Sequence, residues 1–170
     1  MATLEKRAKG NEERIKTFLD YSPETGLFIW KEKPHKNNHM NVGDIAGTLR
    51  PVGYIVIGLD KKYHFAQRLA WFMYYGEWPS VDIDHINGIK SDNRLCNLRL
   101  ATRQENTQNE HKARSNNKSG LLGVHYIDGR YRARLSINGK STFLGRFKTA
   151  EEAHDCYVKA KRKHHPFFML

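Results

Sequence analysis

The spacing of apolar residues changes several times along this chain, and each change marks a different expected element. Residues 11–20 carry apolar side chains at helical spacing behind an asparagine, which predicts a helix. Shorter apolar runs bounded by turn residues predict strands of a small antiparallel sheet at 27–30, 47–57 and 62–65. The run 68–75 is apolar at most positions and is followed by Gly76, so we expect a buried helix that stops at this glycine.

The pattern changes again over residues 81–106. Its first apolar residues alternate with aspartates, as in a half-buried strand, and Asn87-Gly88 is typical of a tight turn. Alternating leucines then predict a short strand, and residues 102–105 (TRQE) match the capping box that opens a helix. We therefore predict a strand, a loop, a short strand and a helix. Asp84 and His85 on the first strand and Asn106 on the helix are expected to face the same cleft.

A separate pattern begins after residue 120. Apolar and polar residues alternate in three runs, which are joined by turns at 127–129 and at Asn138-Gly139. A second capping box, Thr149 to Glu152, opens a helix with apolar residues on one side. We predict a three-stranded meander backed by one helix, and an α+β fold class for the whole chain.

Composition supports two small parts and a polyanionic partner. Only 39% of the 170 residues are hydrophobic, so two modest cores fit better than one large core. Residues 1–110 contain 16 Lys and Arg against 14 Asp and Glu, whereas residues 111–170 contain 13 against 4. A basic C-terminal third favours a nucleic-acid partner, because neutralised phosphates release counterions; a merely soluble cationic surface is the alternative.

Several other classes are not expected from this sequence. Cys96 and Cys156 lie sixty residues apart and outside any CxxC pair, so neither a structural zinc site nor a disulfide framework is predicted. No apolar run approaches the length of a membrane span, and no membrane partner is expected. We expect a protein of the reducing cytoplasm.

Four polar residues at fixed offsets carry candidate chemistry. Asn97 follows His85 by twelve residues, and Asn106 follows Asn97 by nine. The Asp84 carboxylate and a carboxamide oxygen are hard ligands for a divalent cation, and an imidazole accepts a proton from water near neutral pH. This combination indicates a single-metal phosphodiesterase and makes a nuclease the first hypothesis.

The segment DHINGIKSDNRLCNLRLATRQEN closely resembles the ββα-metal core of HNH endonucleases, particularly the phage homing-endonuclease branch, in which the third motif residue is Asn. The resemblance implies that Asp84 and Asn106 bind one Mg²⁺ or Mn²⁺ and that His85 is the general base. Asn97 is implied to belong to the catalytic site as a brace that orients the histidine. Asn106 in place of His or Cys also argues against zinc. One departure is Gln67, where relatives usually carry a histidine.

A second resemblance covers residues 119–165. The segments GVHY, YRARLSINGK, FLGRF and TAEEAHDCY resemble the plant ethylene-response-type (apetala-like) DNA-binding domain, which also occurs fused to phage HNH nucleases. The resemblance implies that the three-stranded sheet enters the DNA major groove. The residues expected to contact DNA there are Arg130, Arg132, Arg134 and Arg146. Arg94 and Arg99 are candidate phosphate contacts near the first motif, or surface charges.

Together these patterns predict an HNH nuclease domain at 1–110 with its core at about 64–110, a basic linker at 111–120 and a DNA-binding domain at 121–170. The expected activity is hydrolysis of phosphodiester bonds in double-stranded DNA by a homing-endonuclease-like enzyme, in the bacterial host of a phage. A non-catalytic DNA-binding regulator with a degenerate nuclease core is the alternative, and an RNA-directed nuclease is a third. Monomer or homodimer, and nick or double-strand cut, both stay open.

Overall fold

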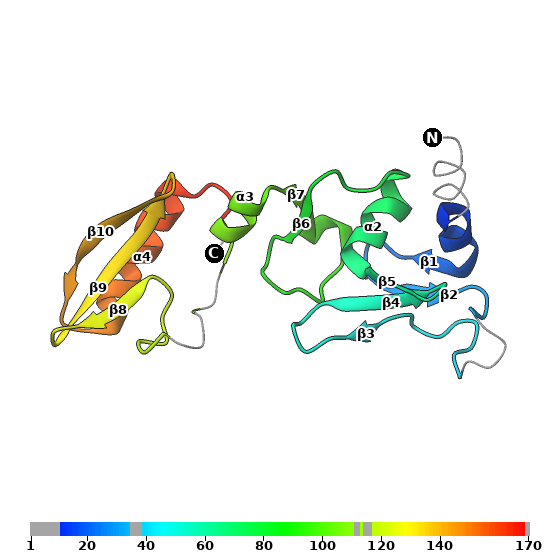
Figure 1. Cartoon of the computed structure of the whole chain (residues 1–170), viewed down its shortest axis with the longest axis horizontal. Helices are drawn as coiled ribbons and strands as arrows, with labels where there is room; N and C mark the ends of the chain where they lie inside the picture. Colours follow the sequence, from blue (N-terminus) through cyan, green and yellow to red (C-terminus); the bar gives the residue numbers. More distant parts are fainter. Residues whose placement is uncertain (1–10, 35–38, 111–112, 114–116, 169–170) are drawn as a thin grey trace. The chain divides into compact units, whose positions relative to one another are not determined.

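The chain folds into two compact units, residues 1–101 and 102–170 (Figure 1). The computed structural model describes residues 11–34, 39–110, 113 and 117–168. It confirms the expected α+β class, with small antiparallel sheets and a C-terminal three-stranded sheet packed on a helix. Of the linker predicted at 111–120, residues 111–112 and 114–116 lie outside the described part.

The first unit begins with helical residues 11–18, followed by short strands and one longer helix. These elements are β1 (Leu19–Tyr21), β2 (Phe28–Trp30), β3 (Thr48–Leu49), β4 (Ile55–Leu59), β5 (Lys62–Phe65), α2 (Ala66–Tyr75), β6 (Asp82–His85), the 3₁₀ turn η1 (Leu95–Asn97) and β7 (Leu98–Ala101). β1 pairs with β2, β4 lies between β3 and β5, and β6 pairs with β7, all antiparallel.

Two sequence predictions in this unit were wrong in their bounds. The helix expected over 11–20 ends at residue 18, because Leu19 pairs with Trp30 in the β1–β2 ladder. The strand expected over 47–57 is two strands, with a turn in which the Gly53 amide donates to the Arg50 carbonyl at 2.8 Å. Pro51 and Gly53 occupy favoured positions of such a turn, so local turn chemistry outweighs the apolar pattern here.

The core of this unit gathers beneath α2. Phe28, Trp30 and Phe72 are its largest buried side chains, each at most 2% exposed. The helix ends as predicted at Gly76, whose backbone is left-handed (φ 79°) and whose amide donates to the Phe72 carbonyl. Trp78 then stacks on Phe72, with ring centroids 4.6 Å apart, and this contact fixes the chain that leads into β6.

The second unit contains the helix α3 and the C-terminal sheet. Its elements are α3 (Arg103–Gln108), β8 (Val124–Ile127), β9 (Arg130–Ile137), β10 (Lys140–Phe147) and α4 (Ala150–His164). β9 is the central strand, and α4 covers one face of the sheet. Both predicted capping boxes are present, at Thr102 and Glu105 for α3 and at Thr149 and Glu152 for α4.

A lysine is buried in the second unit. Lys161 on α4 is 2% exposed, and its ammonium donates to the Glu110 carbonyl at 2.6 Å. The ammonium also lies over the rings of Phe168 and Tyr157, at 4.2 and 5.5 Å from their centroids. Burial lowers the pKa of Lys161 to about 8. The chain just after α3 is therefore held against α4.

In the described part of the chain, no helix is long and apolar enough to cross a membrane.

Gly123 offers a test of the C-terminal core. Its backbone is left-handed (φ 76°), and a Cβ there would overlap the buried ring of Tyr157. Gly120 is also left-handed (φ 70°) but has open space around it. We expect Gly123→Ala to lower the free energy of unfolding by about 1–3 kcal/mol more than Gly120→Ala, because overpacking adds to backbone strain. Urea unfolding followed by circular dichroism measures both; equal losses would contradict this packing.

Candidate active site

The hairpin of β6 and β7 places the two most chemically informative side chains. Asp84 lies directly opposite Arg99 and His85 directly opposite Leu98, so each pair shares a face of the hairpin. Asp84 is 5% exposed and His85 is 4% exposed. The sequence pattern placed Asp84 on the polar face of a half-buried strand. In the structure both faces are covered near the end of β6, so the carboxylate and the imidazole are both buried.

Asp84 is held by Arg99. The Nε and Nη2 atoms of Arg99 donate to Oδ2 of Asp84 at 2.9 and 2.7 Å. The Arg99 side chain is 20% exposed and that of Asp84 is 6% exposed, so the pair is largely shielded from water. Within this protein Arg99 therefore balances the charge of a buried carboxylate.

His85 is in contact with the side chain of Asn93, which was not among the predicted site residues. Its Nε2 lies 3.3 Å from Oδ1 of Asn93, and the Asn93 side chain is almost fully buried. Burial lowers the pKa of His85, and the contact with Asn93 and the negative charge of Asp84 partly oppose this shift. The imidazole is therefore neutral near pH 7, which is the form that accepts a proton.

The ring of Tyr54 lies beside the imidazole of His85. Its ring centroid lies 6.0 Å from that of His85 and 5.5 Å from that of Phe65. Burial raises the pKa of Tyr54, and the charges of Asp84 and Asp82 raise it further, so the phenol keeps its proton. The ammonium of Lys90 lies 4.8 Å from the centroid of the same ring and brings a positive charge near the site.

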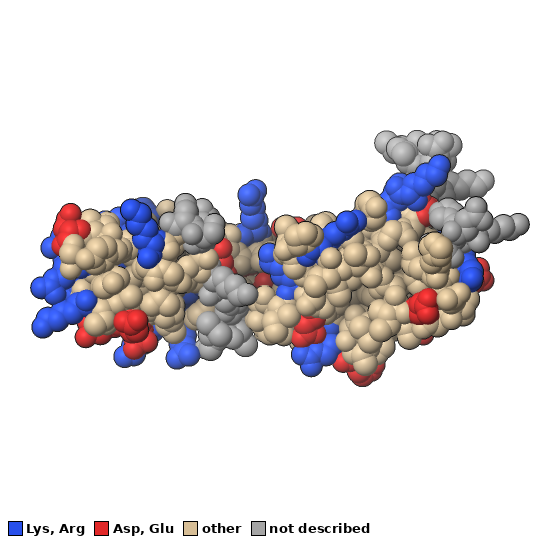
Figure 2. Space-filling view, turned by 90° about the horizontal axis from the view of Figure 1, so that it is seen from below, with Lys and Arg blue, Asp and Glu red and all other residues tan. Residues whose placement is uncertain are grey.

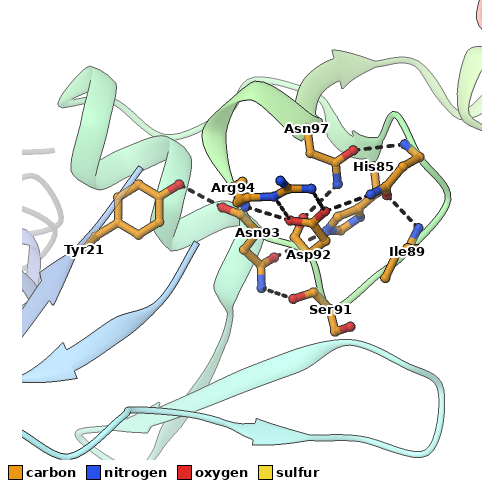
Figure 3. A network of polar contacts seen from close by, with 9 residues as sticks. Tyr21, His85, Ile89, Ser91, Asp92, Asn93, Arg94 and Asn97 are labelled. Atoms are coloured by element: carbon orange, nitrogen blue, oxygen red, sulfur yellow. Dashed lines mark hydrogen bonds and ion pairs between the residues drawn. The ribbon is translucent and has the colours of Figure 1, made fainter. Parts of the chain in front are cut away.

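Asn97 uses both ends of its side chain within the loop that joins β6 to β7 (Figure 3). Its Oδ1 accepts from the Asn87 amide at 2.9 Å, and its Nδ2 donates to the Asp92 carbonyl at 2.8 Å. Asn97 is 6% exposed. These contacts brace the loop. The role of Asn97 in orienting His85 or in a reaction stays a prediction.

Arg94 is engaged with a carboxylate of the same loop. Its Nε and Nη2 atoms donate to the two oxygens of Asp92 at 2.8 and 2.6 Å. These bonds lower the pKa of Asp92 to about 2, with a further bond from Asn87. Arg94 and Arg99, both candidates for contacts with DNA phosphate, thus each pair with an aspartate in this structure.

Asn106 lies on α3, which belongs to the second compact unit. Its backbone amide donates to the Thr102 carbonyl at 2.9 Å, in the first turn after the capping box. Asp84 belongs to the first unit, and the expected meeting of Asn106 and Asp84 at one metal ion stays a prediction.

The arginines expected to bind DNA occupy the sheet face opposite α4. Ala133 and Leu135 of β9 pack in the C-terminal core, and the alternating residues Arg130, Arg132 and Arg134 point to the other side. Arg146 of β10 pairs with Arg132, and Phe143 pairs with Arg134. Arg132 also donates to Asp128 at 2.8 Å. The predicted alternation is confirmed, and DNA contact stays a prediction.

Asn93, Tyr21 and Tyr54 lie around the site but were not predicted from the sequence. Tyr21 donates its hydroxyl to the Asn93 carbonyl at 2.8 Å across 72 residues of sequence. An asparagine inside a polar loop has no periodicity that separates it from its neighbours. Tyr21 ends β1 and Tyr54 precedes β4, and tyrosines at such positions look like ordinary sheet residues. One sequence signal could have identified Asn93, namely its position between the candidate site residues His85 and Asn97.

Gln67, the departure from the family pattern, is 7% exposed on α2. Its Oε1 and Nε2 of His64 are buried and have no hydrogen-bond partner among the described residues. His64 stacks on Trp78, with centroids 6.3 Å apart. The structure thus places Gln67 in the packing of α2.

Comparisons with known proteins support the first of the two resemblances. Residues 64–108 match the family model described as HNH endonuclease. An uncharacterized HNH endonuclease, L560 of Acanthamoeba polyphaga mimivirus, is 36% identical over 83 residues, which cover 48% of this chain and 42% of that relative. This chain thus spans less than half the length of the relative. No solved structure matches.

These matches indicate a nuclease. They place Asp84, His85, Asn97 and Asn106 inside one family segment, and that segment ends before the C-terminal sheet. The ethylene-response-type resemblance of residues 119–165 is not supported by the comparisons and stays a prediction.

The Asp84–Arg99 pair yields a stability prediction. Replacing Arg99 with Met leaves a buried carboxylate without its guanidinium, and we expect the free energy of unfolding to fall by about 3 kcal/mol. The matched control is Arg103→Met, an exposed arginine on α3. Urea unfolding measures both variants. A loss no larger than that of the control would show that Asp84 does not depend on Arg99.

Proposed function

We propose that this protein is a metal-dependent DNA endonuclease that hydrolyses phosphodiester bonds in the manner of a homing endonuclease. The observation that carries the proposal is a buried His85 at the end of β6, next to a buried Asp84 and within the segment that matches HNH endonucleases. Burial lowers the pKa of His85, so the form that can accept a proton from water is present near pH 7.

In the proposed reaction His85 removes a proton from water, and the water oxygen attacks phosphorus. The bond from phosphorus to the 3′ oxygen breaks, and the leaving 3′ oxygen takes a proton from solvent water, so the products are a 5′-phosphate and a 3′-hydroxyl. Asn97 stabilises the loop between β6 and β7 through its hydrogen bonds to Asn87 and Asp92. The ring of Tyr54 lies beside the imidazole, with ring centroids 6.0 Å apart.

The donor chemistry fits one Mg²⁺ or Mn²⁺. The described residues contain no group of three or more His, Cys, Asp or Glu side chains arranged to hold a metal ion. Two protein ligands, a carboxylate and a carboxamide, leave positions for water and phosphate oxygens, which suits these ions. We propose Asp84 and Asn106 as these ligands. When bound, the ion would neutralise negative charge that develops on the phosphate and on the leaving oxygen.

We further propose that the C-terminal unit recognises double-stranded DNA through the sheet face that carries Arg130, Arg132, Arg134 and Arg146. Arg130 and Arg134 are exposed there, beside exposed Phe143. Lysine and arginine side chains project from this unit in several directions (Figure 2). The positive charge of residues 111–170 supports the choice of a polyanion.

The activity is tested by incubating the protein with supercoiled plasmid and Mg²⁺ and following nicked and linear products on a gel. We expect Asp84→Ala and His85→Ala to lower the rate by roughly 100-fold or more, since each removes a group that acts at the reacting phosphate. Matched controls are Asp82→Ala, exposed on the same strand, and His39→Ala, also exposed. Equal rates for all five proteins would end the enzyme hypothesis, and DNA binding without cleavage would favour the regulator. Faster cleavage of an RNA duplex would favour the RNA-directed nuclease.

DNA recognition is tested by measuring affinity at several salt concentrations. Replacing both Arg130 and Arg134 with Ala should weaken binding and reduce the slope of log affinity against log salt by about 2, because two phosphate contacts are lost. The control is Lys159→Ala with Lys163→Ala, an equal loss of charge on exposed positions of α4. An unchanged slope in the variant with Arg130→Ala and Arg134→Ala would show that this sheet face does not bind DNA.

A further inference from the structure

The helix that carries Asn106 is too short to be stable by itself. α3 spans the six residues Arg103–Gln108, and none of them is buried. Isolated helices shorter than about 12 residues are marginal in water, so a short helix in a protein depends on contacts with other segments. A capping box of Thr102 and Glu105 stabilises the N-terminal end of α3. The contacts at its C-terminal end therefore matter for the order of this helix.

The C-terminal end of α3 is joined to α4 by successive hydrogen bonds. The amide of Asn109 donates to the Asn106 carbonyl at 3.1 Å, and Asn109 is 3% exposed. The amide of Glu110 donates to the Thr107 carbonyl at 3.3 Å. The carbonyl of Glu110 in turn accepts from the ammonium of Lys161 at 2.6 Å. The last turn of α3 is therefore connected to α4 through Glu110.

The ammonium of Lys161 is buried at this connection. The side chain is 2% exposed, and the chain after α4 brings the ring of Phe168 to 4.2 Å from the ammonium. A lysine that only filled space would bury its apolar stem and leave its charged end in water. Burying the charge costs free energy that an apolar side chain of similar size would avoid. The position of the ammonium thus points to a specific partner, and the carbonyl of Glu110 is that partner.

We infer that Lys161 is a positioning residue that orders α3 and thereby holds Asn106 ready to bind a metal ion. The ordering of α3 stands by itself, whereas its effect on metal binding rests on the proposed function, in which Asn106 is a ligand. A metal site binds its ion in proportion to the fraction of molecules that have the competent conformation. The C-terminal unit then contributes to the affinity for the metal, through a residue that lies outside the segment matched by the HNH family.

The order of α3 is measured by ¹⁵N relaxation in the full-length protein, without metal, DNA or activity. For the amides of Asn106, Asn109 and Glu110 we expect order parameters of about 0.85 in the native protein and below about 0.6 in Lys161→Met. Methionine keeps the apolar stem and removes the ammonium, and replacing a buried charge by an apolar side chain often leaves global stability unchanged or higher. The matched control is Lys159→Met, which removes an exposed lysine from the same helix and should keep the native values.

Three results of this measurement would overturn the inference. The first is a native protein in which these amides are already flexible, and the second is native order of α3 in Lys161→Met. The third is a loss of order that extends to Ala133 and Leu135 of β9, which lie in the C-terminal core. Such a loss would show that Lys161 supports the whole unit, whereas the inference requires an effect on α3 with β9 unchanged.

The effect on metal binding is tested by nicking of supercoiled plasmid over a range of Mg²⁺ concentrations. If α3 is ordered in about one tenth of the Lys161→Met molecules, the Mg²⁺ concentration for half-maximal rate rises about tenfold, while DNA affinity and the native behaviour of Lys159→Met are retained. An unchanged Mg²⁺ requirement in Lys161→Met with a disordered α3 would overturn the link to Asn106. Absence of nicking by the native protein would instead count against the proposed function, and the order parameters would still decide the role of Lys161 in α3.

Discussion

The structure around the site depends on hydrogen bonds to two buried asparagines in one loop, Asn93 and Asn97. The connection from β6 to β7 brings Asn93 and Asn97 almost completely out of water, and a buried amide without partners costs free energy. Asn97 meets this requirement by bonding the Asn87 amide and the Asp92 carbonyl. Asn93 meets it with Ser91 and His85. The contact that satisfies the Asn93 amide therefore also orients the imidazole of His85.

Local signals in the sequence predicted the elements that local chemistry determines. The capping boxes at Thr102 and Thr149 and the stop at Gly76 are all present, because each depends on residues within a turn of one another. The strand boundary near Pro51 was wrong because apolar residues on both sides concealed a turn.

Contacts between distant segments could not be predicted from such local signals in the sequence. The bond from Tyr21 to Asn93 joins positions 72 residues apart, and no spacing in the sequence encodes it. The pairing of Asp84 with Arg99 requires the register of two strands, and a shift of one residue would have placed another side chain opposite the carboxylate. Candidate residues were therefore found by type and motif, while their immediate partners came only from the fold.

The bond from Lys161 to Glu110 has a consequence for the modularity of the chain. The family segment ends at residue 108, yet α3 belongs to the compact unit that contains α4, and the chain just after α3 is tied to that helix. A recombination event that exchanged the C-terminal unit at its structural boundary would carry Asn106 with it. The inheritance of the proposed metal ligand would then follow the C-terminal unit, and two lineages with the same Asp84 and His85 could differ at the position of Asn106.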